Sequence, residues 1–355
     1  MKMLLSPFVK GALQLKNHIV MAPTTRSRAL HNLPNGLMAT YYKQCAGAGL
    51  VITEGTSPSP EGLGYPRMPG IFSGAQVAGW QATTKAVHAG DSKIFLQLMH
   101  TGRIAHVTNL PDGYQPVGLS AIKAAGDIFS DQAGVQEHSV PVVLDAAGLA
   151  QLITDFVQAA ANASQASFDG VELHAANGYL LEQSLNPHVN NRTDTYGGSR
   201  ENRSRLTLEI AEKIARAIGP EKVGVRLSPY SALHDMPAYD KEEVHQTYAY
   251  LSGELNRLGI AYLHVSDNAA IPQKTHQAIR RAFTNTLIYG NRLSAETAEA
   301  KLQAGAADLV AFGRSFLSNP DFIKRAGKNE AFTAVDSVAL YSANAQEYTA
   351  YPVLD

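Results

Sequence analysis

The stretch Gly170-Val171-Glu172-Leu173-His174-Ala175-Ala176-Asn177-Gly178-Tyr179 decides the fold. Its apolar residues predict a short buried strand that follows a loop. The strand runs directly into a polar turn that carries His174, Asn177 and Tyr179. An imidazole and an amide three positions apart can donate to one ligand oxygen, and a phenol beside them can exchange a proton. Taken alone, the turn is more typical of a loop in which His174 and Asn177 only satisfy backbone groups, so the rest of the chain must decide.

Seven further short apolar runs predict strands of the same kind, at 19–22, 50–53, 94–98, 223–227, 261–265, 287–290 and 309–313. Near-continuous apolar strands suit a parallel sheet that is covered on both faces. Between them the spacing of apolar residues predicts helices at 35–46, 74–89, 146–166, 201–218, 241–258 and 295–304. Eight strands alternating with helices predict an α/β fold, a single (β/α)8 TIM barrel over residues 1–355. An open doubly wound sheet is the alternative.

Two segments lie outside this alternation. Residues 9–18 predict a small N-terminal hairpin with a turn at Lys10-Gly11-Ala12. The segment 101–145, which follows the third strand, is rich in Gly, Pro and Asp. Long loops in compact domains are usually functional or mobile, so this segment is predicted to be an excursion over the mouth of the barrel.

The overall composition indicates a cytoplasmic protein. Its 30 basic and 31 acidic residues give a net charge of −1, which provides no general attraction for nucleic acid or an anionic membrane. The sole cysteine, Cys45, excludes an internal disulfide and fits a reducing compartment. Neither a signal peptide nor an apolar run of about 18 residues is present. We expect a monomer or a homodimer without nucleic-acid or membrane partners.

Polar residues gather where the predicted strands end, which is where barrels of this kind carry their functional residues. They are hard to explain as part of an apolar core. The group comprises Thr25 after the first strand, Gly55 after the second, Gln97 in the third, His174 and Asn177 after the fourth, Arg226 in the fifth, and Gly290, Asn291, Gly313 and Arg314 at the last two.

Arg226 interrupts an otherwise apolar strand, where an unpaired charge is costly. It could form a buried ion pair with a neighbour such as Glu172. It could instead be a fixed cation beside a cofactor that becomes anionic, as a reduced flavin does. Gln97 can both donate and accept, which matches a flavin carbonyl beside an N–H, although a strand-end capping role is open. Thr25 could donate to a flavin carbonyl or serve as a turn residue.

The ends of the last two strands predict a phosphate site. Glycine lets backbone N–H groups approach a phosphate, and Arg314 supplies a planar cationic fork. His100 and His106 near the third strand could suggest a metal. They lack a consistent set of partner ligands, so we expect no metal and a role in a solvated loop.

Several motifs together resemble the old yellow enzyme family of flavin-dependent ene-reductases, and look most like its bacterial branch with N-ethylmaleimide reductase and pentaerythritol tetranitrate reductase. The most diagnostic is 192–199 followed by 201–203. The resemblance runs from about residue 7 to residue 352. The other motifs are 21–26, 52–55, 172–181, 226–229, 312–314 and 348–352.

The resemblance implies a TIM barrel with noncovalently bound FMN and with NADPH or NADH as reductant. It implies a role for each matched residue. The isoalloxazine would be surrounded by Pro23, Thr25, Gly55, Gln97 and Arg226, and the phosphate would be held by Gly290, Asn291, Gly313 and Arg314. The substrate oxygen would be bound by His174 and Asn177, and the proton donor would be Tyr179. The substrate pocket would be lined by Met99 and Tyr348.

The implied reaction reduces the activated C=C bond of an α,β-unsaturated carbonyl or nitro compound. Hydride passes from NAD(P)H to flavin N5 and then to the substrate β-carbon, Tyr179 protonates the α-carbon, and the kinetics are ping-pong. A nitro or nitrate-ester reductase would use the same residues and stays open. An RNA-directed dihydrouridine-synthase-like barrel needs a basic surface and a cysteine at the mouth, which the net charge and Cys45 disfavour. A barrel that binds ligands without turnover is disfavoured by the intact His174, Asn177 and Tyr179.

Three positions depart from part of that family. Met99 stands where many members carry Trp, which predicts a different wall of the substrate pocket, although it could simply fill space. Asn177 stands where some members carry His, and both residues donate. Thr25 stands where another branch carries cysteine.

Overall fold

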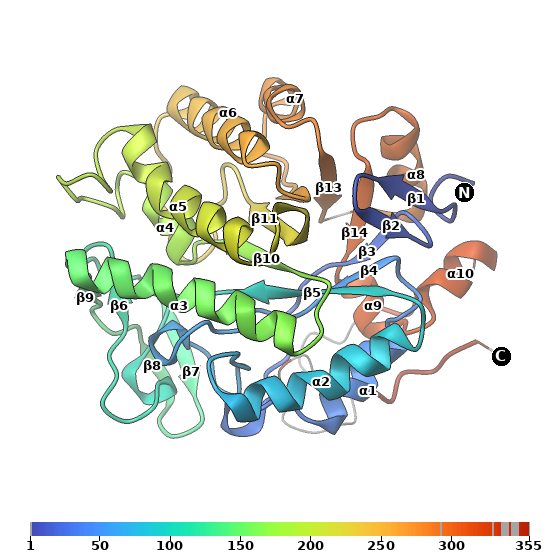
Figure 1. Cartoon of the computed structure of the whole chain (residues 1–355), viewed down its shortest axis with the longest axis horizontal. Coiled ribbons are helices and arrows are strands. Elements are labelled where there is room, and N and C mark those ends of the chain that lie inside the picture. Colours follow the sequence, from blue (N-terminus) through green and yellow to red (C-terminus); the bar gives the residue numbers. More distant parts are fainter. Residues whose placement is uncertain (1, 292, 329, 335–340, 342–347, 355) are drawn as a thin grey trace.

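The computed structural model describes residues 2–291, 293–328, 330–334, 341 and 348–354. Within them, parallel strands close into a barrel in the order β10-β11-β12-β13-β14-β3-β4-β5 (Figure 1). The predicted eight-stranded barrel is therefore confirmed, and the open sheet is wrong. The strands are β3 (Ile19–Met21), β4 (Leu50–Ile52), β5 (Lys93–Leu98), β10 (Gly170–Ala175), β11 (Val223–Leu227), β12 (Tyr262–Ser266), β13 (Thr286–Gly290) and β14 (Leu309–Phe312).

All of the predicted helices are present with small shifts at their ends. Each begins after an Asn, Ser or Asp whose side chain accepts a backbone N–H of the first turn, which stabilises the helix start. They are α1 (Gly36–Gln44), α2 (Gly74–His88), α3 (Ala146–Gln165), α5 (Arg200–Ile218), α6 (Lys241–Arg257) and α8 (Ala295–Gln303). Among the described residues the structure adds four α-helices that the sequence did not predict, namely α4 (Leu180–Leu185), α7 (Gln273–Ala282), α9 (Arg314–Ser318) and α10 (Phe322–Lys328).

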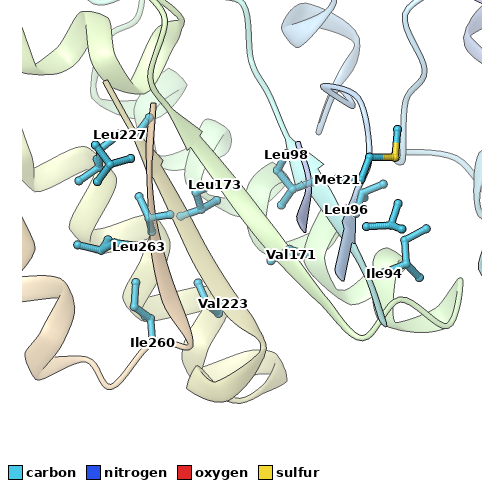
Figure 2. Close-up of a cluster of buried hydrophobic side chains, with 14 of the residues drawn as sticks. Met21, Ile94, Leu96, Leu98, Val171, Leu173, Val223, Leu227, Ile260 and Leu263 are labelled. Atoms are coloured by element: carbon cyan, nitrogen blue, oxygen red, sulfur yellow. The ribbon is translucent and has the colours of Figure 1, made fainter. Parts of the chain in front are cut away.

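Alternate residues of each strand face opposite sides of the barrel wall. On β10, Val171 and Leu173 belong to a large apolar cluster shared with the surrounding helices. Figure 2 shows side chains of this cluster on several neighbouring strands. Because side chains of a strand alternate, Glu172 and His174 project to the other side, into the barrel. The helices therefore stabilise the wall from outside, and the interior is left for polar groups near the carboxyl ends.

The amino end of the barrel is filled by the N-terminal hairpin. Strands β1 (Phe8–Lys10) and β2 (Leu13–Leu15) pair antiparallel, as predicted. Phe8, Leu13 and Leu15 pack in one buried cluster with residues that begin the barrel strands, including Leu50 and Tyr262. This apolar plug closes the amino end of the barrel.

The predicted excursion forms two small sheets on the opposite side of the molecule from the hairpin (Figure 1). Its 125–129 segment lines the main cavity, which confirms the expected location over the mouth. No helix among the described residues is long and apolar enough to cross a membrane. The sheets pair β6 (Val117–Gly118) with β9 (Val142–Val143), and β7 (Asp127–Ser130) with β8 (Gly134–Glu137).

Candidate active site

The barrel register brings polar residues of neighbouring strands to the same level. His174 on β10 is paired with Arg226 on β11, and Arg226 is paired with His264 on β12. One step nearer the amino end, Glu172 on β10 is paired with Gln97 on β5. Paired residues of parallel strands face the same side of the sheet, so these five side chains share the barrel interior.

A cavity of about 810 Å³ opens at this end of the barrel. Its volume is in the range of pockets that bind organic ligands. The structure brings together in its wall the predicted residues Pro23, Thr25, Gln97, Met99, His174, Asn177, Tyr179 and Arg226.

The charge of Arg226 has no ion-pair partner in the described part of the chain. Its Nε atom is buried without a hydrogen-bond partner. Glu172, the partner considered from the sequence, instead accepts Gln97 Nε2–H at 2.8 Å and His264 Nδ1–H at 2.9 Å. The buried Arg226–Glu172 ion pair is therefore not formed, and the guanidinium faces the cavity as a fixed cation.

The turn that carries Asn177 is held by a buried carboxylate. Asn177 and Gly178 have positive φ angles of 56° and 81°, which are uncommon for asparagine and ordinary for glycine. Gly178 N–H donates to Glu182 Oε2 at 2.5 Å, and Ser228 Oγ–H donates to Glu182 Oε1 at 2.6 Å. Ser228 Oγ in turn accepts the Asn177 N–H at 2.7 Å. These bonds fix the Asn177 backbone, while its side-chain Oδ1 is buried without a partner.

Glu182 is itself an unusual group. Its carboxylate also accepts the Tyr248 hydroxyl at 2.8 Å. Burial raises the pKa of Glu182 to about 7, and its hydrogen-bond donors oppose that rise. The residue that organises the turn is thus titratable near neutral pH.

His174 is neutral and open to a ligand. Burial, and then the charge of Arg226, hold the pKa of His174 well below its usual value. Its Nδ1 is buried with no hydrogen-bond partner. A neutral imidazole keeps one N–H donor, so His174 and the nearby Asn177 can both bind a ligand oxygen.

Tyr179 is a protonated phenol at the centre of the cavity wall. Its ring lies edge-on to His174, with ring centroids 4.9 Å apart. Burial raises the pKa of Tyr179 to about 12, so it carries its proton at neutral pH. Its hydroxyl lies 3.0 Å from the hydroxyl of Tyr65. A buried phenol in this arrangement can act as a general acid.

Met99 forms part of the cavity wall and packs against Gly55. Met99 is buried in a small cluster with Ile104 and Tyr179. A Cβ atom added to Gly55 would lie 2.4 Å from the Met99 Cε atom, so the absence of a side chain at Gly55 makes room for Met99. Gly55, predicted to contact a cofactor, lies behind Met99 and is not among the residues that line the cavity.

The predicted phosphate residues meet at two adjacent strand ends. Gly290 on β13 is paired with Ala311 on β14, and Gly313 follows β14 directly. The side chain of Asn291 donates to the Asp267 carbonyl at 2.8 Å. Arg314 is exposed. These residues lie beside each other, outside the wall of the main cavity.

Tyr348, which was predicted to line the substrate pocket, is not among the residues that line the cavity. It is buried and stacks on Tyr41, with ring centroids 4.2 Å apart. The Arg26 guanidinium lies 4.9 Å from the centre of its ring. Tyr341 is the C-terminal tyrosine that lines the cavity in the described part of the chain.

His100 corrects one expectation. It was predicted to lie in a solvated loop, but its side chain is buried and its Nδ1 accepts the Gly102 N–H at 3.1 Å. Burial lowers the pKa of His100 to about 3, so the ring is a neutral loop cap. His106 has the local role expected, because its Nδ1 lies 2.8 Å from Thr108 Oγ1.

Sequence reasoning missed the cavity residues that lie deep in the loops. Tyr65 lies in the loop after β4, His234 in the loop after β11, and His138 in the excursion. The sequence signal that could have indicated them was the length of these loops. A long loop can fold back over the mouth of the barrel and place residues there that are far from a strand end.

Comparison with known proteins gives consistent results. Residues 3–332 match the NADH:flavin oxidoreductase / NADH oxidase family. Among curated proteins, 12-oxophytodienoate reductase 1 of Oryza sativa subsp. japonica is 36% identical over 362 residues, covering 99% of this chain and 93% of that protein. Among solved structures, morphinone reductase in complex with tetrahydroNAD is 41% identical with a TM-score of 0.95, covering 99% and 98% of the two chains. The old yellow enzyme homologue from Zymomonas mobilis is 38% identical with a TM-score of 0.94, covering 99% of both.

Proposed function

The chain belongs to the NADH:flavin oxidoreductase / NADH oxidase family as an old yellow enzyme homologue, and on that premise we propose that it is an ene-reductase. It would use FMN and NADPH or NADH to reduce activated C=C bonds of α,β-unsaturated carbonyl and nitro compounds. The observation that carries the proposal is the convergence of His174, Asn177 and Tyr179 with Arg226 on one cavity.

The residues present fit a flavin. Arg226 offers a half-buried cation without an ion-pair partner among the described residues, and Gln97 and Thr25 offer hydrogen-bonding groups in the same cavity wall. Gly290, Asn291, Gly313 and Arg314 would hold the phosphate at the adjacent ends of β13 and β14. Bound here, the flavin would accept hydride from the nicotinamide and pass it to the substrate, and the fixed Arg226 charge favours its anionic reduced form.

The chain's own residues then divide the remaining work. His174 and Asn177 would bind the oxygen of the substrate's electron-withdrawing group and stabilise the negative charge that it gains. Tyr179 would donate its proton to the α-carbon. The Glu182 network holds the Asn177 backbone in place before substrate arrives, so little ordering remains to be done on binding.

The similarity to known proteins supports a nicotinamide reductant, because the related morphinone reductase forms a complex with tetrahydroNAD. It also supports reductase chemistry, because a curated relative is named 12-oxophytodienoate reductase. The RNA-directed alternative is not proposed. Cys45, which such a reaction would need at the mouth, is buried at the end of α1.

A steady-state screen of enones, maleimides and nitro compounds with NADH and NADPH tests the proposal. We expect enone reduction with parallel lines in double-reciprocal plots, as ping-pong kinetics require. His174→Ala and Asn177→Ala should each lower kcat/KM by about 10²-fold or more, because each removes a donor to the developing charge. His245→Ala, in a half-buried histidine of α6, is the matched control. Absence of turnover with every enone, or equal rates for His174→Ala and wild type, would contradict the proposal.

A further inference from the structure

A chain of hydrogen bonds joins three residues of the cavity wall, Tyr179, Tyr65 and His234. The Tyr179 hydroxyl lies 3.0 Å from the Tyr65 hydroxyl, and the Tyr65 hydroxyl lies 3.2 Å from His234 Nε2. The rings of Tyr179 and His234 are also in contact, with centroids 4.9 Å apart. Tyr179 is buried, whereas His234 is half-buried in the loop that follows β11. The chain therefore joins a buried phenol to a group that solvent reaches.

The second nitrogen of His234 fixes the direction of this chain. Nδ1 lies 2.5 Å from the Asn177 carbonyl oxygen, which can only accept, so Nδ1 carries a hydrogen. In the neutral ring, Nε2 is then the acceptor for the Tyr65 hydroxyl. Burial lowers the pKa of His234, so Nε2 is unprotonated at neutral pH and can take up a proton.

We propose that His234 and Tyr65 return a proton to Tyr179 after each reduction of substrate. This proposal rests on the proposed role of Tyr179 as proton donor. Once Tyr179 has given its proton to carbon, water protonates His234 at Nε2. The Nε2–H proton passes to the Tyr65 oxygen while the Tyr65 O–H proton passes to the Tyr179 phenolate. His234 ends neutral, both phenols are protonated, and one proton has been taken from water.

The surroundings of Tyr179 explain why such a route is needed. Tyr179 is only 8% exposed, so its direct contact with water is small, and burial makes its phenolate costly. Negative charge on Tyr179 also favours a proton on the nearby imidazole, which offsets the effect of burial on His234. Other titratable or charged groups near the relay are His138, His174, Tyr341 and the Arg103–Asp235 ion pair.

Counting turnovers separates proton return from simple positioning of Tyr179. Holoenzyme is reduced with excess NADPH and mixed with excess cyclic enone, and product is followed in the first and later turnovers. In His234→Gln and Tyr65→Phe we expect a first turnover within about twofold of wild type. Later turnovers should slow by roughly tenfold or more, the scale of a lost acid–base step. These two variants should therefore show a burst, meaning a first turnover that is faster than the later ones. Wild type and the control variant His245→Gln should show no burst.

Imidazole provides a second readout. Later turnovers of His234→Ala should accelerate when imidazole is added, because a free base of similar pKa can carry the missing proton. Tyr65→Phe should not respond to imidazole, because this variant lacks the hydroxyl that joins His234 to Tyr179. Bound flavin and the unfolding temperature of each variant verify that it is folded.

Two results would overturn the proposal. Equal slowing of first and later turnovers in His234→Gln would show that the ring only positions Tyr179, and an absent burst would show that protons reach Tyr179 by another path. Tyr179→Phe tests the premise separately. If that variant keeps the wild-type first turnover, Tyr179 is not the donor, and the failure lies with the proposed function.

Discussion

At the scale of single residues, the conformation of the Asn177–Gly178 turn depends on one buried carboxylate. Glu182 accepts from Gly178 N–H, Ser228 and Tyr248, and it is three residues past Tyr179 in sequence. The sequence gives no sign of this role for Glu182, because the short helix α4 that carries it was itself not predicted. The donors come from the turn after β10, the residue after β11, and α6, so the network forms only when these segments are brought together.

Glu182 should make stability depend on pH. Its folded pKa of about 7 exceeds the ordinary carboxyl value, so the folded state binds a proton that the unfolded chain has lost. The free energy of unfolding therefore falls as pH rises from about 4.5 to about 7. In Glu182→Gln this contribution is absent. Urea unfolding of both proteins at about pH 5 and about pH 8 measures this. From about pH 5 to about pH 8, the free energy of unfolding of wild type should fall relative to that of Glu182→Gln. If the difference between the two proteins is the same at both pH values, Glu182 is not the titrating group.

Met99 should control which substrates enter. It is buried against Gly55 and beside Tyr179, so an indole cannot replace it without entering the cavity. Met99→Trp should lower kcat/KM for bulky enones by about tenfold while small enones change little. Rates measured over a size-graded enone panel give the comparison. An unchanged ranking would mean that this wall does not select substrate.

Single residues also show where sequence reasoning reaches its limit. His174, Gln97 and Arg226 were predicted, because polar residues at the ends of apolar strands are conspicuous. That Glu172 binds Gln97 and His264 instead of Arg226 was not predictable, because the choice depends on side-chain directions across four strands. Tyr65 and His234 were missed because each reaches the cavity through the path of a long loop.

At the scale of elements, the strands were predicted within about two residues, since both of their faces are buried and their apolar runs are continuous. Helix α7 was missed for the opposite reason. It is ten residues long and mostly polar, and the buried residues in it are Thr275, Ala278 and Ile279, so few apolar residues mark it in the sequence. It forms because the barrel brings it against α6, which local sequence does not reveal.

The N-terminal hairpin should contribute stability without taking part in chemistry. Leu15 is buried in the plug at the amino end, whereas Val9 on the same hairpin is 71% exposed. Leu15→Ala should lower the free energy of unfolding by about 3 kcal/mol through the cavity that it leaves. Val9→Ala should change it by less than about 0.5 kcal/mol. Urea unfolding measures both, and a change in the KM for enone in Leu15→Ala would contradict a purely structural role.

At the scale of the whole molecule, the two ends of the barrel have different roles, because one end contributes to stability and the other carries the candidate active site. Its amino end is filled with apolar side chains, and its carboxyl end carries a cavity of about 810 Å³ that loops and the excursion partly enclose. The sequence predicted this polarity from the order of strands and polar residues. It did not predict the shape of the cavity, because the segments 65–67, 125–129 and 233–234 that complete its wall come from three separate loops.

The central claim is that this cavity holds a flavin beside Arg226 and Gln97, with His174 and Asn177 available to the substrate. The most direct test is to denature the purified protein, remove the polypeptide by filtration and identify the released chromophore by fluorescence and mass. We predict a yellow protein that releases FMN in an amount equal to the protein, and Arg226→Ala should retain much less of it. A colourless protein that neither releases FMN nor takes it up when FMN is added would contradict the claim.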